Sequence, residues 1–135
     1  IDHSEDMVAL TGRRNADAVD EGRCEVVPGD AHALPWPDDA FTACACVATF
    51  LFFDRPVTVL EEVRRVLAPG GRVVIITPGE DAPAFLKGLQ SEDERVYLYS
   101  PTAFEELMDR AGFSERTVGM EAERLVAVGR VRREE

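Results

Sequence analysis

The sequence predicts an α/β fold with a mostly parallel sheet ending in an antiparallel hairpin. Residues 43–47 and 72–77 are almost wholly apolar, as in strands covered on both faces, and a helical pattern separates them. Residues 113–120 and 125–131 are also typical of strands, and only the acidic turn 121–123 lies between them. So short a connection joins antiparallel strands, because parallel strands need a crossover.

The first predicted element is a helix that begins after Ser4. Ser4 is a suitable N-cap, and Glu5 and Asp6 place negative charge in the first turn, where the helix dipole favours it. Weak alternation over residues 24–27 predicts a short strand that stops at a Pro-Gly pair. Residues 33–40 contain two prolines and two aspartates, which indicates a loop.

Two further amphipathic helices are predicted, with a shorter helix over residues 83–89. Asp54 is the expected cap of the first, a proline occupies its first turn, and the Pro-Gly-Gly turn at 69–71 ends it. Ser100 is the expected cap of the second, and Gly112 closes it. The inner face of the helix that follows Asp54 comprises Val59, Leu60, Val63, Val66 and Leu67.

Length and charge exclude several classes of protein. The chain has 135 residues, which suits one domain. Its 15 Lys and Arg against 26 Asp and Glu give a net charge of −11, which repels nucleic-acid phosphates. No apolar run approaches the roughly 18 residues that span a bilayer. Three cysteines, an odd count without a secretory leader, favour reduced thiols in the cytoplasm. We therefore expect a cytoplasmic protein that binds neither nucleic acid nor a membrane.

The beginning of the chain indicates that a preceding segment belongs to the same domain. The sequence opens at Ile1, without a methionine, and residues 1–4 resemble the end of a strand that enters a helix cap. We therefore expect an N-terminally truncated domain.

Carboxylates follow two of the predicted strands, where open α/β sheets bind ligands. Asp2 follows the truncated first strand and is placed to accept the two hydroxyls of a ribose; the alternative is an additional helix cap. Asp30 follows a glycine at the next strand end, where a carboxylate can accept a proton from an exocyclic amine such as that of adenine. The alternative for Asp30 is an ordinary turn aspartate.

Four segments in series carry a family resemblance. They are IDHSEDM at residues 1–7, PGDAHALPWPDDAF at 28–41, RVLAPGGRVVI at 65–75, and the helix from Ser100 to the AGF at 111–113. In this order and spacing they resemble class I S-adenosylmethionine-dependent methyltransferases, most closely the small-molecule branch that includes quinone-biosynthesis enzymes. The resemblance spans nearly the whole chain and implies a Rossmann-like fold, so that residues 1–135 form a partial class I methyltransferase domain.

The resemblance implies a site for the cofactor S-adenosylmethionine. Asp2 would hold the ribose, and His3 and Met7 would line the adenine. Asp30 would accept the adenine amino group beside the backbone of Ala31. The six residues implied are Asp2, His3, Met7, Asp30, Ala31 and Val47, the last facing the methionine part.

The sequence departs from the family pattern in three places. The glycine-rich turn after the family's first strand, which approaches the methionine moiety, is absent with that strand. Thr42 stands where an aspartate is usual. Residues 51–53, Leu-Phe-Phe, replace a more polar stretch, which indicates either an apolar acceptor pocket or a core wall.

Other cysteine, histidine and tyrosine residues could belong to a functional site but have simpler interpretations. Cys44 and Cys46 share one face of a strand, and buried thiols are favoured over a metal site. His32 is expected to be an exposed loop histidine rather than a base. Tyr97 and Tyr99 follow the strand at 72–77 and are weak candidates for the substrate side.

The function expected is methyl transfer from S-adenosylmethionine to a small-molecule acceptor, with no catalytic base assigned. A methyltransferase-like binding or scaffold module is one alternative, and a nucleotide-dependent oxidoreductase is another, since an acid after the second strand also serves NAD folds. An exposed sheet edge makes a homodimer the expected form of association.

Overall fold

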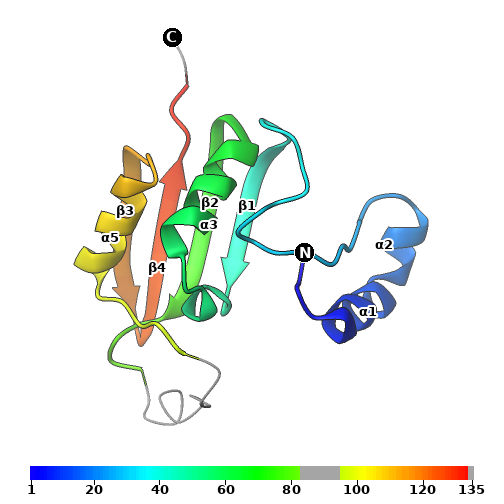
Figure 1. Ribbon diagram of the computed structural model, residues 1–135, viewed down its shortest axis with the longest axis horizontal. Helices are drawn as coiled ribbons and strands as arrows, with labels where there is room; N and C mark the ends of the chain where they lie inside the picture. Colours follow the sequence, from blue (N-terminus) through cyan, green and yellow to red (C-terminus); the bar gives the residue numbers. More distant parts are fainter. Residues whose placement is uncertain (83–94, 134–135) are drawn as a thin grey trace. The chain divides into compact units, whose positions relative to one another are not determined.

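A computed structural model describes residues 1–82 and 95–133, and the chain divides into two compact units, Ile1–Pro35 and Trp36–Glu135 (Figure 1). The helix predicted over residues 83–89 lies outside the described residues. Within the described ranges, no helix is long and apolar enough to cross a bilayer.

The first unit contains the helices α1 (Glu5–Arg14) and α2 (Ala16–Asp20). Ser4 is the N-cap of α1, as predicted, and its Oγ accepts the Met7 N–H at 3.3 Å. The strand predicted over residues 24–27 is wrong: these residues form no strand, and the one parallel bridge nearby joins Asp2 to Pro28, the residue that follows them.

The second unit is a four-stranded sheet with the order β1-β2-β4-β3. Strand β1 (Phe41–Val47) pairs in parallel with β2 (Leu67–Pro78), and β3 (Glu115–Glu121) and β4 (Arg124–Arg130) form the predicted antiparallel hairpin. Because β4 also runs antiparallel to β2, the described sheet is mixed rather than mostly parallel. The α/β fold ending in a hairpin is confirmed.

The Pro-Gly-Gly segment lies inside β2 and not in a separate turn after the helix. Phe41 pairs with Leu67 and Ala43 with Arg72, so two steps along β1 correspond to five along β2, and three residues bulge out. Gly70 has a φ of 83°, a conformation that favours glycine, and its N–H donates to the carbonyl of Val131 at 2.8 Å. The helix therefore passes directly into the strand.

Two helices, α3 (Pro56–Val66) and α5 (Pro101–Arg110), cover one face of this sheet (Figure 1). Helix α3 begins at Pro56 with Arg55 as its N-cap, one residue after the predicted Asp54. Ser100 caps α5 as predicted, its Oγ accepting the Ala103 N–H at 3.1 Å. The core between helices and sheet is apolar and includes Leu60, Val66, Val73, Ile75, Phe104, Met108, Leu125 and Ala127.

Arg65 of α3 fixes the loop that leads into β1. Its guanidinium donates to both carboxylate oxygens of Glu62, at 2.6 and 3.2 Å, and also to the Trp36 carbonyl at 2.8 Å and to Asp38 Oδ1 at 3.0 Å. The Arg65 carbonyl accepts the Asp39 N–H at 3.1 Å. The Glu62 and Asp38 carboxylates raise the pKa of Arg65. Residues 36–39 of the LPWPDDAF motif thus have a structural role.

Candidate functional site

Two chain segments of the first unit run side by side at the predicted cofactor site. The Asp2 N–H donates to the Val27 carbonyl at 3.2 Å, and the Gly29 N–H donates to the Asp2 carbonyl at 3.0 Å. Asp30 follows Gly29 directly, so the backbone pairing places Asp2 and Asp30 on adjoining segments. A Cβ at Gly29 would lie 2.8 Å from Ile1 Cδ1, which shows how closely the two segments approach.

The Asp2 carboxylate is held at the start of α1. Its Oδ1 accepts the Ser4 N–H at 2.8 Å, so the interpretation of Asp2 as an additional helix cap is confirmed. The other oxygen, Oδ2, accepts no hydrogen bond from the residues at 1–82 and 95–133, and the side chain is 41% exposed. One oxygen is therefore anchored while the side chain remains partly accessible, an arrangement that leaves the carboxylate able to bind a diol.

Asp30 forms a short contact with His32 that the sequence did not predict. Asp30 Oδ1 accepts the His32 N–H at 2.8 Å and lies 2.7 Å from His32 Nδ1. The His32 side chain is 13% exposed, so the expectation of an exposed loop histidine is wrong. The Asp-x-His spacing is the signal that could have revealed it, since an aspartate side chain commonly bonds the backbone two residues on.

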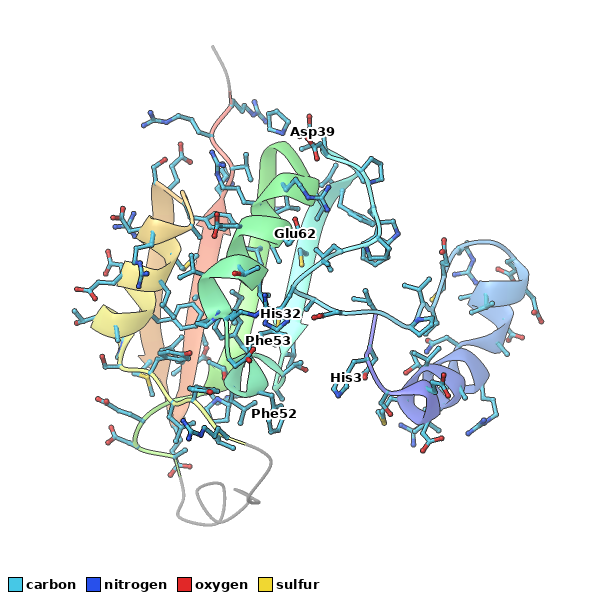
Figure 2. All side chains as sticks on the ribbon, viewed as in Figure 1. His3, His32, Asp39, Phe52, Phe53 and Glu62 are labelled. Carbon is cyan, nitrogen blue, oxygen red and sulfur yellow. The ribbon has the colours of Figure 1, made fainter. Side chains whose placement is uncertain are left out.

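The remaining predicted residues of the first unit are accessible. His3 is 89% exposed, and its Nδ1 lies 3.7 Å from Asp2 Oδ1; Figure 2 shows it projecting near the start of α1. Met7, in the first turns of α1, is 46% exposed. Ala31 lies in the turn between Asp30 and His32. Apolar and ring surfaces thus lie close in sequence to the Asp2 carboxylate.

Val47, the predicted contact for the methionine part, lies in the second unit. It ends β1 and is 58% exposed. The next residue, Ala48, has a φ of 55° and donates its N–H to the Ile76 carbonyl at 2.8 Å. Both parallel strands, β1 and β2, therefore end together at this edge of the sheet, where open α/β sheets place ligands.

The segment after Val47 is part core wall and part exposed surface. The short helix η1 (Phe50–Phe52) buries Leu51, whose carbonyl accepts the Tyr97 N–H at 2.7 Å. Phe52 is 47% exposed, and Figure 2 shows it with Phe53 beyond the end of β1. The core-wall interpretation holds for Leu51, and Phe52 remains accessible.

The aromatic residues behind this segment form a cluster. The ring centroid of Phe50 lies 4.9 Å from that of Phe104 and 6.1 Å from that of Tyr99. Burial raises the pKa of the Tyr99 hydroxyl. Tyr99 is partly buried and packs its ring against Phe50 and Phe104.

The strand cysteines, Cys44 and Cys46, are partly buried free thiols. Burial raises the pKa of Cys44, and burial together with the neighbouring Cys44 raises that of Cys46 to about 11. Among residues 1–82 and 95–133, no group of three His, Cys, Asp or Glu side chains is arranged to hold a metal ion.

The fold is a Rossmann-like α/β arrangement, and comparison with known proteins gives the family. Residues 1–75 match the family model described as Methyltransferase domain, and the chain belongs to this family.

Two relatives act in quinone biosynthesis according to their names. The ubiquinone/menaquinone biosynthesis C-methyltransferase UbiE of Methylobacterium nodulans is 32% identical, with 87% of this chain and 56% of the relative covered. The demethylmenaquinone methyltransferase of Thermus thermophilus is 34% identical, with 85% and 62% covered. The chain thus spans about three fifths of the length of these relatives.

Solved structures share the fold at lower sequence identity. A SAM-dependent methyltransferase from Thermotoga maritima matches with a TM-score of 0.70 and 23% identity, over 87% of this chain and 69% of that one. The cyclase SpnF matches with a TM-score of 0.77 and 16% identity, over 98% and 64%. At these identities the likeness concerns the fold alone.

Proposed function

We propose that this protein transfers a methyl group from S-adenosylmethionine to a small-molecule acceptor. Membership of the methyltransferase family supports the reaction, and the names of the quinone methyltransferases it resembles support a small acceptor. The observation that carries the cofactor assignment is the bridge between Asp2 and Pro28, because it sets Asp2 and Asp30 on adjoining segments.

The residues of the first unit fit the adenosine part of this cofactor. Oδ1 of Asp2 accepts the Ser4 N–H and the side chain is 41% exposed, so a ribose hydroxyl can donate to Oδ2 without breaking the contact at the helix cap. Asp30 is 61% exposed and can accept the exocyclic amine of the base. His3 and Met7 offer accessible surface for the adenine ring, and Ala31 its backbone.

The chemistry needs alignment more than proton transfer. When bound, S-adenosylmethionine supplies a methyl group on a positively charged sulfur, which passes to the acceptor nucleophile and leaves S-adenosylhomocysteine. Asp2 and Asp30 would fix the adenosine end, and Val47 would contact the methionine part. Alignment of this kind lowers a barrier by about 7–11 kcal/mol in favourable cases. No residue is assigned as a general base.

Isothermal titration of the chain with S-adenosylhomocysteine tests the proposal. Asp2→Asn keeps the oxygen that accepts the Ser4 N–H but removes the charge, so we expect a Kd raised about ten- to a hundredfold. Asp6→Asn is the matched control, because it makes the same change on α1 outside the proposed contacts and should leave the Kd within about twofold. A folded wild-type chain that binds no ligand at millimolar concentration would refute the cofactor assignment.

We also propose that the protein acts in the cytoplasm, without nucleic acid or membrane partners, and forms a homodimer. The net charge of −11 and the three free cysteines support the first two parts. The edge strand β1, which pairs only with β2 among the described strands, supports the third.

A further inference from the structure

The side chain of His32 makes a close contact with the proposed adenine-binding carboxylate of Asp30. Its backbone N–H and its ring Nδ1 both meet the same oxygen, Asp30 Oδ1, at 2.8 and 2.7 Å. The two side chains differ in accessibility, since His32 is 13% exposed and Asp30 is 61% exposed. The ring therefore braces the carboxylate from the covered side and leaves it accessible from the other.

We propose that His32 is a positioning residue that keeps Asp30 oriented as a hydrogen-bond acceptor for the adenine amine and thereby favours adenine over hypoxanthine. The inference rests on the proposed function, because it assigns a role within the same cofactor site. Beyond the proposed function, His32 contacts Asp30 rather than the cofactor, and the contact predicts which base the site prefers.

The geometry explains why the ring matters in addition to the backbone. Two donors that approach Oδ1 from different directions restrict rotation about the Cβ–Cγ bond more than one donor does. A carboxylate only accepts hydrogen bonds, so the His32 ring makes this contact when its proton is on Nδ1.

The selectivity follows from what each base presents to that acceptor. Adenine offers an N–H donor at its exocyclic position, whereas hypoxanthine offers a carbonyl oxygen there. A fixed carboxylate accepts from the first and repels the second, and such a repulsive element is a common basis of specificity. A carboxylate that can rotate away discriminates less.

A substitution series separates positioning from a general structural role. His32→Ala removes the ring donor but keeps the backbone N–H. His32→Asn restores a donor, because the amide Nδ2 is the same number of bonds from the backbone as Nδ1. Asp30→Asn removes the carboxylate that His32 is proposed to orient. All variants are first compared with wild type by thermal unfolding.

Binding of S-adenosylhomocysteine and of its hypoxanthine analogue, S-inosylhomocysteine, is measured by isothermal titration. We expect His32→Ala to raise the Kd of the adenine ligand about three- to tenfold, to lower the ratio between the two Kd values, and to be largely rescued by His32→Asn. In the Asp30→Asn background, His32→Ala should have no further effect on the Kd.

A ligand-free measurement tests the contact itself. Long-range ¹H–¹⁵N spectra should show the wild-type His32 ring with its proton on Nδ1, and Asp30→Asn should change that pattern. The positioning role would be overturned if His32→Ala had the same Kd as wild type for each of the two ligands while Asp30→Asn still weakened binding of S-adenosylhomocysteine. That outcome would leave the proposed function standing. Failure of the wild-type chain to bind S-adenosylhomocysteine would overturn both.

Discussion

Two glycines of the C-terminal hairpin provide a matched test of the core packing. Gly129 lies in β4, and a Cβ built there would be 2.7 Å from Met108 Cε and 2.9 Å from Phe113 Cδ1. Gly119 lies in β3, and a Cβ there would have no neighbour within 4 Å. The same substitution to alanine should therefore have opposite effects on stability at the two positions.

The magnitude follows from two competing terms. Alanine in place of glycine reduces the freedom of the unfolded chain and stabilises an open strand position by about 0.5–1 kcal/mol. At Gly129 the added methyl also overpacks the core, which costs about 1–3 kcal/mol. Met108 is fully buried and Phe113 is 1% exposed, so both neighbours of the added methyl are enclosed in the core. We expect Gly129→Ala to lower the free energy of unfolding by about 1 kcal/mol and Gly119→Ala to raise it by about 0.5 kcal/mol.

Urea denaturation followed by circular dichroism measures both changes. The comparison is valid if the dependence of the free energy on urea is the same in the three proteins, so that shifts of the midpoint report stability. A Gly129→Ala protein at least as stable as wild type would refute the packing argument, as would a Gly119→Ala protein that is the less stable of the two variants.

Three further predictions address other parts of the second unit. Thr77 is 1% exposed, and its Oγ1 has no hydrogen-bond partner among the described residues, so Thr77→Val should raise the free energy of unfolding by about 1 kcal/mol. The control is Thr117→Val at an exposed position of β3, which should change the free energy of unfolding by less than about 0.5 kcal/mol. Burial raises the pKa of Cys46 to about 11, so the thiol ionises at a lower pH in the unfolded chain than in the folded one. The contribution of Cys46 to stability should therefore be constant between neutral pH and about pH 9 and be lost toward pH 11, a loss that Cys46→Ala reduces and Cys24→Ala does not. Sedimentation equilibrium should show a dimer, and a monomer at all concentrations would contradict the proposed association of edge strands.

Local sequence signals were sufficient for the elements whose ends are fixed by their own residues. Ser4 and Ser100 cap α1 and α5 through the hydroxyl contacts that their positions predicted. The hairpin was predictable because only a short acidic turn separates its strands, and that turn contains Ala122 with a φ of 57°. Each of these features depends on neighbours within a few positions in the chain.

Features that depend on distant partners could not be predicted in the same way. Residues 24–27 have a strand-like pattern but form no strand, because a pattern alone does not say whether a neighbouring segment pairs with it; the single bridge is at Pro28. The mixed sheet depends on where β4 inserts, which periodicity does not encode. The clamp that Arg65 forms on Trp36 and Asp38 joins residues 27 or more positions apart.

In the candidate site too, some features follow from local sequence and others depend on how the chain folds. Asp2 and Asp30 were predicted from their positions after strand ends and from the resemblance, and the backbone pairing at Pro28 brings their segments together. His32 was assigned to solvent because its contact with Asp30 depends on the conformation of the turn. Val47, in the second unit, lies at a strand end as expected, and its proposed contact with the cofactor remains a prediction.

The fold alone does not determine which reaction occurs. SpnF, named as a cyclase, superimposes on this chain at least as well as the Thermotoga maritima methyltransferase does. A sheet of this kind positions a ligand, and the side chains at the strand ends decide which ligand it is. The Asp2 and Asp30 carboxylates argue for an adenosine group whatever the reaction, so adenosine binding and methyl transfer are separable claims. Binding of S-adenosylhomocysteine tests the first; only methylation of an identified acceptor tests the second.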